Sequence, residues 1–358
     1  MYRATLSSMN KDANPMPELT ERQLYILAAL IRTYIQQPEP VSSKQLVDEQ
    51  GLNVSSATVR NELAMLEQLG MIRAPHTSAG RVPTEDGYRY FVQNLLTEHD
   101  LSITERQRIK YEFREAAQDI QKWLRTAANV LARRTSAAAL VTEPRSRSVS
   151  FKHLQLIGMH GNVVLLVMVL EGGELTQQML TLREVVDQER LSQVAAMIND
   201  ICHGKTAVGV RQKSQEVHDF LAQEVMELAA EVMHESDENG SLAIHWYGFS
   251  ELLPRFEEGS GAQQALRILD EKTLIDELLK ETIAADADDV RVLVGGEGRE
   301  EFSELSIVIG RYGTRNMAGA ISVLGPIRMR YGRAISTVRY VSNLMTAMIQ
   351  DIYGGTES

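Results

Sequence analysis

The side chains best suited to recognising a ligand lie close together between Ser55 and Asn61. Arginine can donate two hydrogen bonds to guanine, asparagine pairs in the same way with adenine, and the methyl group of threonine can contact a thymine methyl. These residue types therefore predict contacts with DNA bases and phosphates. Ser, Thr and Asn also cap helices, and this alternative, with a solvated arginine, explains the segment equally well. The candidate DNA-binding residues here are Lys44, Ser55, Ser56, Thr58, Arg60 and Asn61.

A second group of polar residues follows in a segment that predicts a β-hairpin. Two short strand-like runs, Met71 to Ala74 and Arg81 to Pro83, flank a turn that contains Gly80. A hairpin beside a DNA-reading helix would bring cations and hydroxyl groups to the phosphates. A turn with only a structural role is the alternative. The candidate phosphate-binding residues are Arg73, His76, Thr77, Ser78 and Arg81.

Three helices are predicted to position these residues. Capping-box spacing starts the first helix at Thr20 and the second at Ser42. The third begins after Ser55 or Ser56 and ends at Gly70, and its apolar residues share one face. Two helices joined by a short turn and followed by a wing match a winged helix-turn-helix. In that fold the N-terminal residues of the second helix of the pair lie along the base edges.

Other residues that can do chemistry form weaker patterns. Gly295-Gly296-Glu297-Gly298 lacks the glycine spacing and the lysine of a phosphate-binding loop, which favours a surface turn. Cys202 and His203 have no second pair of ligands, so a buried thiol beside a surface histidine is favoured over a metal site. The remaining histidines form no catalytic arrangement. We therefore expect no catalytic residue, metal, cofactor or enzyme activity.

Composition and charge place the DNA-reading segment in a larger protein. The chain has 358 residues, of which 44% are apolar, a single cysteine and a formal net charge of -11. This length predicts two or three domains, and the single cysteine suits a reducing cytoplasm. Basic and acidic residues nearly balance between Leu19 and Tyr90. The acidity therefore lies in the rest of the chain, which would repel phosphates and favour protein contacts. No apolar run is long enough to cross a membrane.

The rest of the chain predicts an α+β body. A long helix is expected from Ile103 to Arg134, and three strands with glycine turns between them would form an antiparallel sheet. Helical and strand-like patterns then alternate towards the end of the chain. The expected strands are 154–159, 162–170, 173–182, 290–295 and 305–309, and the further helices are 191–201, 215–233 and 335–353.

Two signatures in this sequence resemble those of the heat-inducible transcription repressor family, HrcA. The first runs from Val54 to Leu63 and continues through Leu66-Glu67, Gly70 and His76 to Thr84. The second is Gly325-Pro326-Ile327-Arg328-Met329-Arg330-Tyr331, followed by Ile335 and Val338 to Ser342. The resemblance extends from about Leu19 to Tyr353.

The resemblance implies a winged-helix domain, a GAF-like α+β domain and a dimerisation segment inserted into the GAF-like domain. The first residues of the chain are polar and irregular, so we expect them to form a disordered extension. The expected boundaries are 1–18 for the extension, 19–96 for the DNA-binding domain, 97–212 and 286–358 for the GAF-like domain, and 213–285 for the inserted segment.

The resemblance also implies a function. It predicts a cytoplasmic homodimer that represses heat-shock chaperone operons, binds an inverted-repeat operator in double-stranded DNA, and is kept active by a GroE-type chaperonin. The alternative is a small-molecule-sensing regulator, because GAF-like sheets often enclose a ligand pocket. In the second signature, Arg328, Met329, Arg330 and Tyr331 are either a candidate interaction surface or a turn that leads into the last helix.

Overall fold

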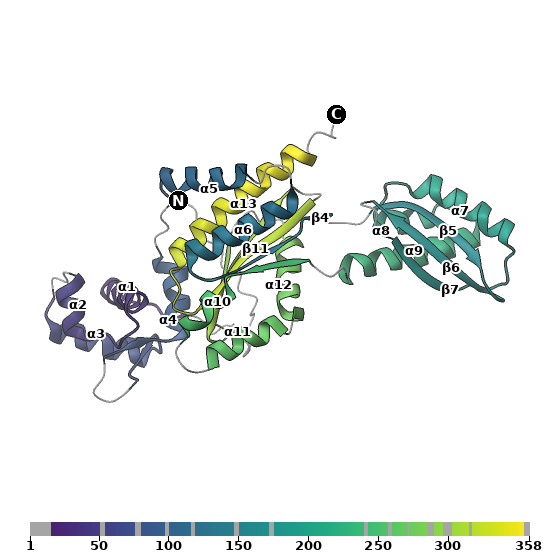
Figure 1. Ribbon diagram of the computed structural model, residues 1–358. Coiled ribbons are helices and arrows are strands. Elements are labelled where there is room, and N and C mark those ends of the chain that lie inside the picture. The colour runs from purple at the N-terminus through teal and green to yellow at the C-terminus, as the bar shows by residue number, and fades with distance from the viewer. Residues whose placement is uncertain are drawn as a thin grey trace. The chain divides into compact units, whose positions relative to one another are not determined.

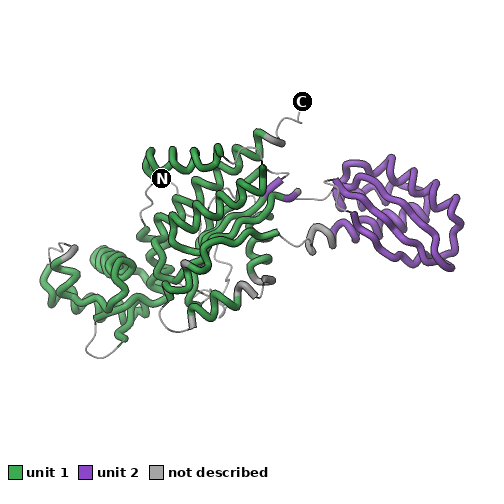
Figure 2. The backbone as a smooth tube through the Cα atoms, in the orientation of Figure 1, with its two compact units in different colours: residues 1–144, 243–314, 319–358 green, residues 145–242, 315–318 purple. Residues whose placement is uncertain are grey.

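A computed structural model gives the fold of the chain (Figure 1). The chain divides into two compact units (Figure 2), of which the first joins 1–144, 243–314 and 319–358 and the second joins 145–242 and 315–318. The structure describes residues 16–50, 54–75, 80–96, 100–115, 119–146, 150–171, 175–239, 243–256, 260–270, 272–284, 290–295, 303–314 and 317–353. The extension expected over 1–18 therefore lies almost wholly outside the described residues.

The first unit begins with the predicted winged helix. Thr20 starts α1 with a reciprocal capping box, and the Ser42 hydroxyl accepts a hydrogen bond of 3.1 Å from the Gln45 amide at the start of α2. The wing strands β1 and β2 are antiparallel, and Val41 adds a third short segment by bridging to Arg81. The predicted helices and hairpin strands are thus confirmed. Their bounds are α1 Glu21–Gln36, α2 Ser43–Gln50, α3 Ser56–Gln68, β1 Ile72–Arg73, β2 Val82–Pro83, α4 Glu85–Tyr90 and the π-helical turn η1 Phe91–Leu95.

The rest of the first unit is a sheet covered by helices, with strand order β8-β3-β11-β10-β9. The short strand β4 pairs with Met317 and Ala318 of β11, and the division into units assigns both of these segments to the second unit. Every residue of β10 and nearly every residue of β11 is buried, so both faces of these strands are covered. Helices α6 and α13 pack against the sheet and against each other, and α11 and α12 also contact β10 (Figure 1). The strands are β3 Ala138–Thr142, β4 Arg145–Ser146, β8 Ile244–Tyr247, β9 Arg291–Val294, β10 Leu305–Gly313 and β11 Met317–Pro326. The helices are α5 Ile103–Arg114, α6 Ile120–Thr135, α10 Phe249–Leu252, η2 Leu253–Arg255, α11 Ser260–Asp270, α12 Lys272–Ala284 and α13 Tyr331–Tyr353.

The single long helix expected from Ile103 to Arg134 is wrong, because the structure has α5 and α6 in its place. Asp119 separates them. Its carboxylate accepts hydrogen bonds from the backbone amides of Gln121 at 2.9 Å and Lys122 at 3.4 Å, and its backbone is extended. An aspartate that satisfies these amides starts a new helix at this point.

The second unit is a three-stranded antiparallel sheet with helices packed on one face. The strands follow one another as β5 Phe151–Gly158, β6 Val163–Leu170 and β7 Leu175–Thr181, and their helices are α7 Gln188–Cys202, α8 Ala207–Ser214 and α9 Phe220–Asn239. Leu166 and Met168 of β6 belong to the same core as Val194 of α7 and Met226 of α9. The three expected strands are therefore confirmed.

The position of the insertion differs from the expected 213–285. The separate unit starts at 145, because the predicted strands between 151 and 181 build their own sheet and core instead of joining the sheet of the first unit. It also ends at 242, because β8 pairs with β3, and α11 and α12 contact β10, within the first unit. A strand pattern predicts the strand but not the sheet that it joins, which explains the difference.

Among the described residues of the second unit, helices pack on one face of the sheet and none packs on the other. In the strand register Leu165 lies between Ile157 and Met179, which makes an apolar row across all three strands. The exposed fraction is 39% for Ile157 and 53% for Met179, and Leu165 is half-buried. We call this surface the open sheet face, and its apolar residues are Ile157, Met159, Leu165, Val167, Val169, Leu175 and Met179.

Candidate nucleic-acid interface

The third helix presents its polar N-terminal residues to solvent. The Ser55 hydroxyl accepts a hydrogen bond from the Thr58 amide at 3.1 Å and lies 2.9 Å from the Thr58 hydroxyl, so these two side chains cap α3. Val59, Leu63 and Leu66 are buried on the opposite side of the helix. Ser56, Arg60 and Asn61 are consequently exposed on the outer side.

The residues that cap α3 thus differ from Arg60 and Asn61, which are exposed on its outer side. The capping interpretation holds for Ser55 and Thr58, whose hydroxyl groups bond locally. Arg60 and Asn61 have the exposure that contact with base edges requires. Lys44 is exposed on α2, the helix that precedes α3 in the helix-turn-helix.

The wing carries one exposed cation among its described residues. Arg73 ends β1 and is exposed. His76, Thr77 and Ser78 lie outside the described residues. A cation at this end of a wing is well placed for a phosphate contact.

The second wing arginine has an internal partner. The Arg81 guanidinium donates a hydrogen bond from Nε to Glu67 Oε2 at 3.0 Å, and a terminal nitrogen forms an ion pair with the same oxygen at 2.9 Å. The other carboxylate oxygen of Glu67 accepts a bond of 3.0 Å from the Ala74 amide. Glu67 therefore ties both strands of the wing to the end of α3. This geometry favours the structural alternative for Arg81, and sequence reasoning missed Glu67 because the partners are fourteen residues apart.

We expect Glu67→Gln and Arg81→Gln to lower DNA affinity by similar amounts and to be non-additive, because both changes release the same part-buried pair. Exposed and half-exposed ion pairs contribute about 0.5–1 kcal/mol, so each loss should be of that order. A double-mutant cycle on operator DNA measures the coupling. If Arg81→Gln alone lowers the salt dependence of binding and Glu67→Gln does not, Arg81 contacts a phosphate.

Arg73→Ala should weaken binding to all DNA sequences alike and reduce the salt slope by about one phosphate contact. Titrations of operator and scrambled DNA at several salt concentrations measure both effects. Arg125→Ala is a suitable control, because it removes an exposed arginine from α6 rather than from the wing. An unchanged slope for Arg73→Ala would assign this residue a structural role.

The cationic side chains of the DNA-reading domain are partly neutralised by neighbouring carboxylates. Arg22 lies 3.5 Å from Glu62, and Arg89 pairs with Glu85 and with Asp86. The near-neutral charge inferred from the sequence is thus reflected in local ion pairs. One such domain has weak electrostatic attraction to phosphates, so its affinity must come from a few well-placed contacts.

Comparison with known proteins identifies the family. The model of the HrcA protein C-terminal domain matches residues 121–335, and the model of the winged helix-turn-helix transcription repressor, HrcA DNA-binding, matches residues 18–96. The chain belongs to the HrcA family of heat-inducible transcription repressors. The family assignment, the winged-helix DNA-binding domain, the α+β class and the repressor function predicted from the sequence are therefore confirmed.

Relatives in this HrcA family cover nearly the whole chain. The heat-inducible transcription repressor HrcA of Roseiflexus castenholzii is 40% identical over 94% of this chain and 96% of its own length. The proteins of the same name from Herpetosiphon aurantiacus and Thermomicrobium roseum are 39% and 34% identical, over 94% and 95% of this chain and 97% and 98% of their own lengths. A solved structure of a hypothetical protein shares the fold, with a TM-score of 0.54 and 22% identity over 93% of this chain and 99% of that chain.

The second HrcA signature lies mostly inside the first unit. Met329 and Tyr331 are buried, Arg328 is half-buried and Arg330 is exposed. The Tyr331 hydroxyl lies 2.7 Å from the Ser306 hydroxyl and donates to the Ile327 carbonyl at 2.6 Å, and burial raises its pKa. This arrangement favours the turn into α13 over an external interaction surface.

Cys202 and His203 have ordinary structural surroundings, and Gly296-Glu297-Gly298 of the glycine-rich pattern lies outside the described residues. Cys202 is buried, and burial raises the pKa of its thiol to about 11, whereas His203 is exposed and its Nδ1 lies 3.1 Å from the Lys152 carbonyl oxygen. Among the described residues, no cluster of three His, Cys, Asp or Glu residues is suitable for a metal ion. No helix in the described part of the chain is long and apolar enough to cross a membrane.

Proposed function

We propose that this repressor acts in the cytoplasm as a homodimer on the inverted-repeat operators of heat-shock chaperone operons. In this proposal α3 enters the major groove and the wing contacts phosphates. The observation that carries it is the exposure of Arg60 and Asn61 on a helix whose opposite face is buried. A GroE-type chaperonin keeps the repressor active, as the family resemblance implies.

The open sheet face supports the homodimer. β6 is apolar at every position, a pattern typical of strands that are buried on both faces. Its residues Leu165, Val167 and Val169 are only half-buried in the monomer. Exposed apolar residues flank Leu165 on both sides and Val169 on β7, whereas Gln155 and Gln177 flank Val167. A contiguous apolar surface of this kind marks a protein interface. A second copy of the same face is our proposed partner, because a two-fold axis pairs identical surfaces.

The weak charge of a single DNA-reading domain favours an operator with two half-sites. A nearly neutral winged helix has little phosphate attraction, and a dimer compensates by binding two half-sites at once. Two DNA-reading domains that are related by a two-fold axis match an inverted repeat. Its half-site centres are separated by whole turns of the DNA helix, each of about 10 to 10.5 base pairs.

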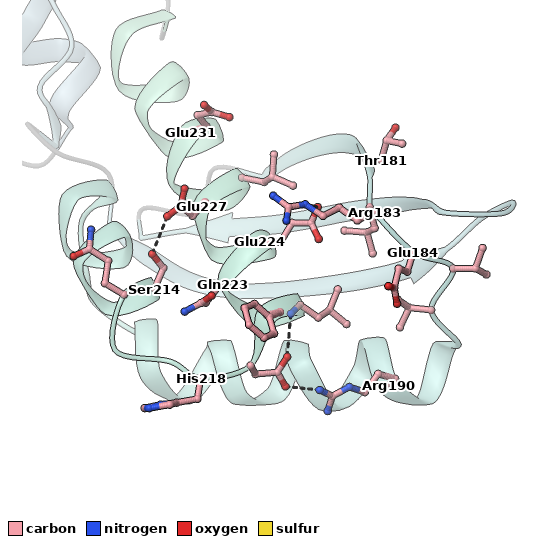
Figure 3. A pocket seen from close by; sticks show the side chains of 18 of the residues that line it. Thr181, Arg183, Glu184, Arg190, Ser214, His218, Gln223, Glu224, Glu227 and Glu231 are labelled. Atoms are coloured by element: carbon pink, nitrogen blue, oxygen red, sulfur yellow. Dashed lines mark hydrogen bonds and ion pairs between the residues drawn. The ribbon is translucent and has the colours of Figure 1, made fainter.

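A small-molecule-sensing regulator is the second candidate, and a hollow in the second unit bears on it. This hollow of about 1570 Å³ is bordered by α9 and by the segment after β7 (Figure 3). Two of its arginines pair with carboxylates of the lining, Arg190 with Asp219 and Arg183 with Glu224 at 3.7 Å. Small-molecule sites are mostly apolar with a few convergent polar groups. The lining therefore gives no specific support to ligand sensing.

Footprinting and titration of the full chain on the promoter of its host's chaperonin operon test the proposal. We expect protection of two symmetric half-sites, much weaker binding when one half-site is scrambled, and a larger active fraction when chaperonin is added. Equal affinity for one half-site and for the complete operator would contradict dimer-dependent recognition. A small molecule released from the purified protein on denaturation would support the second candidate.

A further inference from the structure

The DNA-reading domain and the sheet of the first unit meet at a small set of buried residues. The rings of Tyr88 in α4 and Tyr331 at the start of α13 lie 6.4 Å apart between centroids, with an angle of 51° between their planes. Each tyrosine is only 1% exposed. Residues more than two hundred positions apart in the chain thus form a packed aromatic contact.

The two tyrosines differ in how they are held. Tyr331 is fixed to the body, because its hydroxyl lies within hydrogen-bonding distance of Ser306 and donates to the Ile327 carbonyl. The Tyr88 hydroxyl has no hydrogen-bond partner in the part of the chain that the structure describes. Ring packing against Tyr331 is therefore a specific contact between Tyr88 and the body of the first unit.

A second contact lies at the end of β9. Gly295 has a φ of +66°, and a Cβ atom at this position would lie 2.2 Å from the carboxyl carbon of Glu85 in α4. A side chain at Gly295 would therefore displace the Glu85 side chain from the end of β9, and the positive φ would be strained for any residue other than glycine. The absence of a side chain lets Glu85 of α4 lie against this end of the strand.

Helix α4 is in turn firmly connected to the DNA-reading helix. The Thr84 side chain accepts a hydrogen bond of 3.1 Å from the Gly87 amide and donates one of 2.6 Å to the carbonyl of Gly70, just after α3. A Cβ atom at Gly87 would lie 2.0 Å from the Met71 carbonyl oxygen, so α4 also lies directly against the start of the wing. A displacement of α4 would therefore displace α3.

From these contacts we infer that Glu85, Tyr88, Gly295 and Tyr331 form a joint that fixes the direction of α3 relative to the sheet of the first unit and thereby sharpens the repressor's discrimination between half-site spacings. This inference rests on the proposed dimeric binding to an inverted repeat. The second signature of the family then acts inside the molecule, as the body's side of the joint. A hollow of about 560 Å³, lined by residues of both sides that include Arg32, Gln36, Arg330 and Tyr331, lies beside the contact.

The test uses the full chain and three DNA fragments. These are a single half-site, the operator with its natural spacing, and the operator with about 5 additional base pairs, which is half a helical turn. For the wild type we expect the insertion to reduce affinity at least about tenfold, because the second reader then faces the wrong side of the DNA. Tyr331→Ala and Gly295→Ala should lower affinity for the natural operator and shrink the insertion penalty to less than about threefold, and single half-site binding should not change.

Tyr312→Phe is the matched control for Tyr331→Phe. Tyr312 is also 1% exposed and also donates a buried hydrogen bond, to the Thr142 carbonyl at 2.6 Å, but it lies on β10 and pairs with β3 rather than with α4. Both changes remove one buried tyrosine hydroxyl and should lower the melting temperature of the body similarly. Only Tyr331→Phe should weaken discrimination against the insertion, and this variant replaces Tyr331→Ala if the alanine variant does not fold.

The outcomes separate the two proposals. If the wild type shows no insertion penalty and binds one half-site as tightly as the operator, dimeric recognition is wrong. In that case there are no half-site spacings between which the joint could discriminate. If the wild type shows the penalty and folded Tyr331 and Gly295 variants keep it unchanged, dimeric recognition stands and the inference about the joint is overturned.

Discussion

Leu165→Lys is expected to separate the dimer and to lower affinity for the complete operator by about a hundredfold or more, which is the range that avidity contributes. Leu165 lies on the middle strand of the second unit's sheet, between Ile157 and Met179. In a symmetric interface the new ammonium group would face apolar residues of the second copy, and two such charges would be desolvated at once. Sedimentation and operator titration measure the two effects.

A lysine on another exposed apolar position of the same unit provides the control. Val208 on α8 is 66% exposed and lies away from the sheet, so Val208→Lys should leave the dimer and operator binding intact. Binding to a single half-site should be unchanged in both variants, because the reading domain is not touched. A Leu165→Lys protein that remains dimeric and binds the operator normally would show that the open sheet face is not the dimer interface.

Arg60→Ala and Asn61→Ala are expected to cost about 1–3 kcal/mol of specific binding per half-site and to relax base preference at one position. Both side chains are exposed beside the capped start of α3, where a recognition helix contacts base edges. Titration of operators with single-base changes at each position reveals which base each residue reads. The fold should not change, because neither side chain is buried.

Arg22→Ala is the control for this pair of variants. Arg22 is an exposed arginine of the same domain that pairs with Glu62 at 3.5 Å, on the first helix rather than the third. Its replacement should change affinity slightly and leave base preference unchanged. Equal losses on operator and scrambled DNA for Arg60→Ala would exclude base reading and leave a phosphate contact.

The elements of the DNA-reading domain were predictable because their signals are local. Thr20 and Gln23 form a capping box within one helical turn, and Val59, Leu63 and Leu66 repeat at helical spacing. The bond between Glu67 and Arg81 could not be predicted in this way. Both residues are of types that are usually solvated, and only the folded wing brings them together.

The assignment of strands to sheets was less predictable than the strands themselves. Residues 151–181 have clear strand patterns, yet nothing local distinguishes a separate three-stranded sheet from part of a larger one. The pairing of β3 with β8 joins segments about a hundred residues apart, and the Ala138–Thr142 strand begins with two alanines that carry little β-propensity. Long-range pairings of this kind decide the domain boundary.

The pairing of β3 with β8 also has a consequence for how the protein folds and evolves. The chain leaves the first unit after β3 and returns at β8, and the Glu143 amide donates to the Ala243 carbonyl at 3.0 Å. An unfolded segment of this length would have to be closed into a loop before the two strands could pair, at an entropic cost that grows with its length. Because residues 145–242 have a core of their own, their folding can bring the two strands together first. The same geometry makes residues 145–242 exchangeable. Any domain whose ends lie side by side, or a short hairpin turn, would fit between β3 and β8 and leave the DNA-reading domain attached to an intact body.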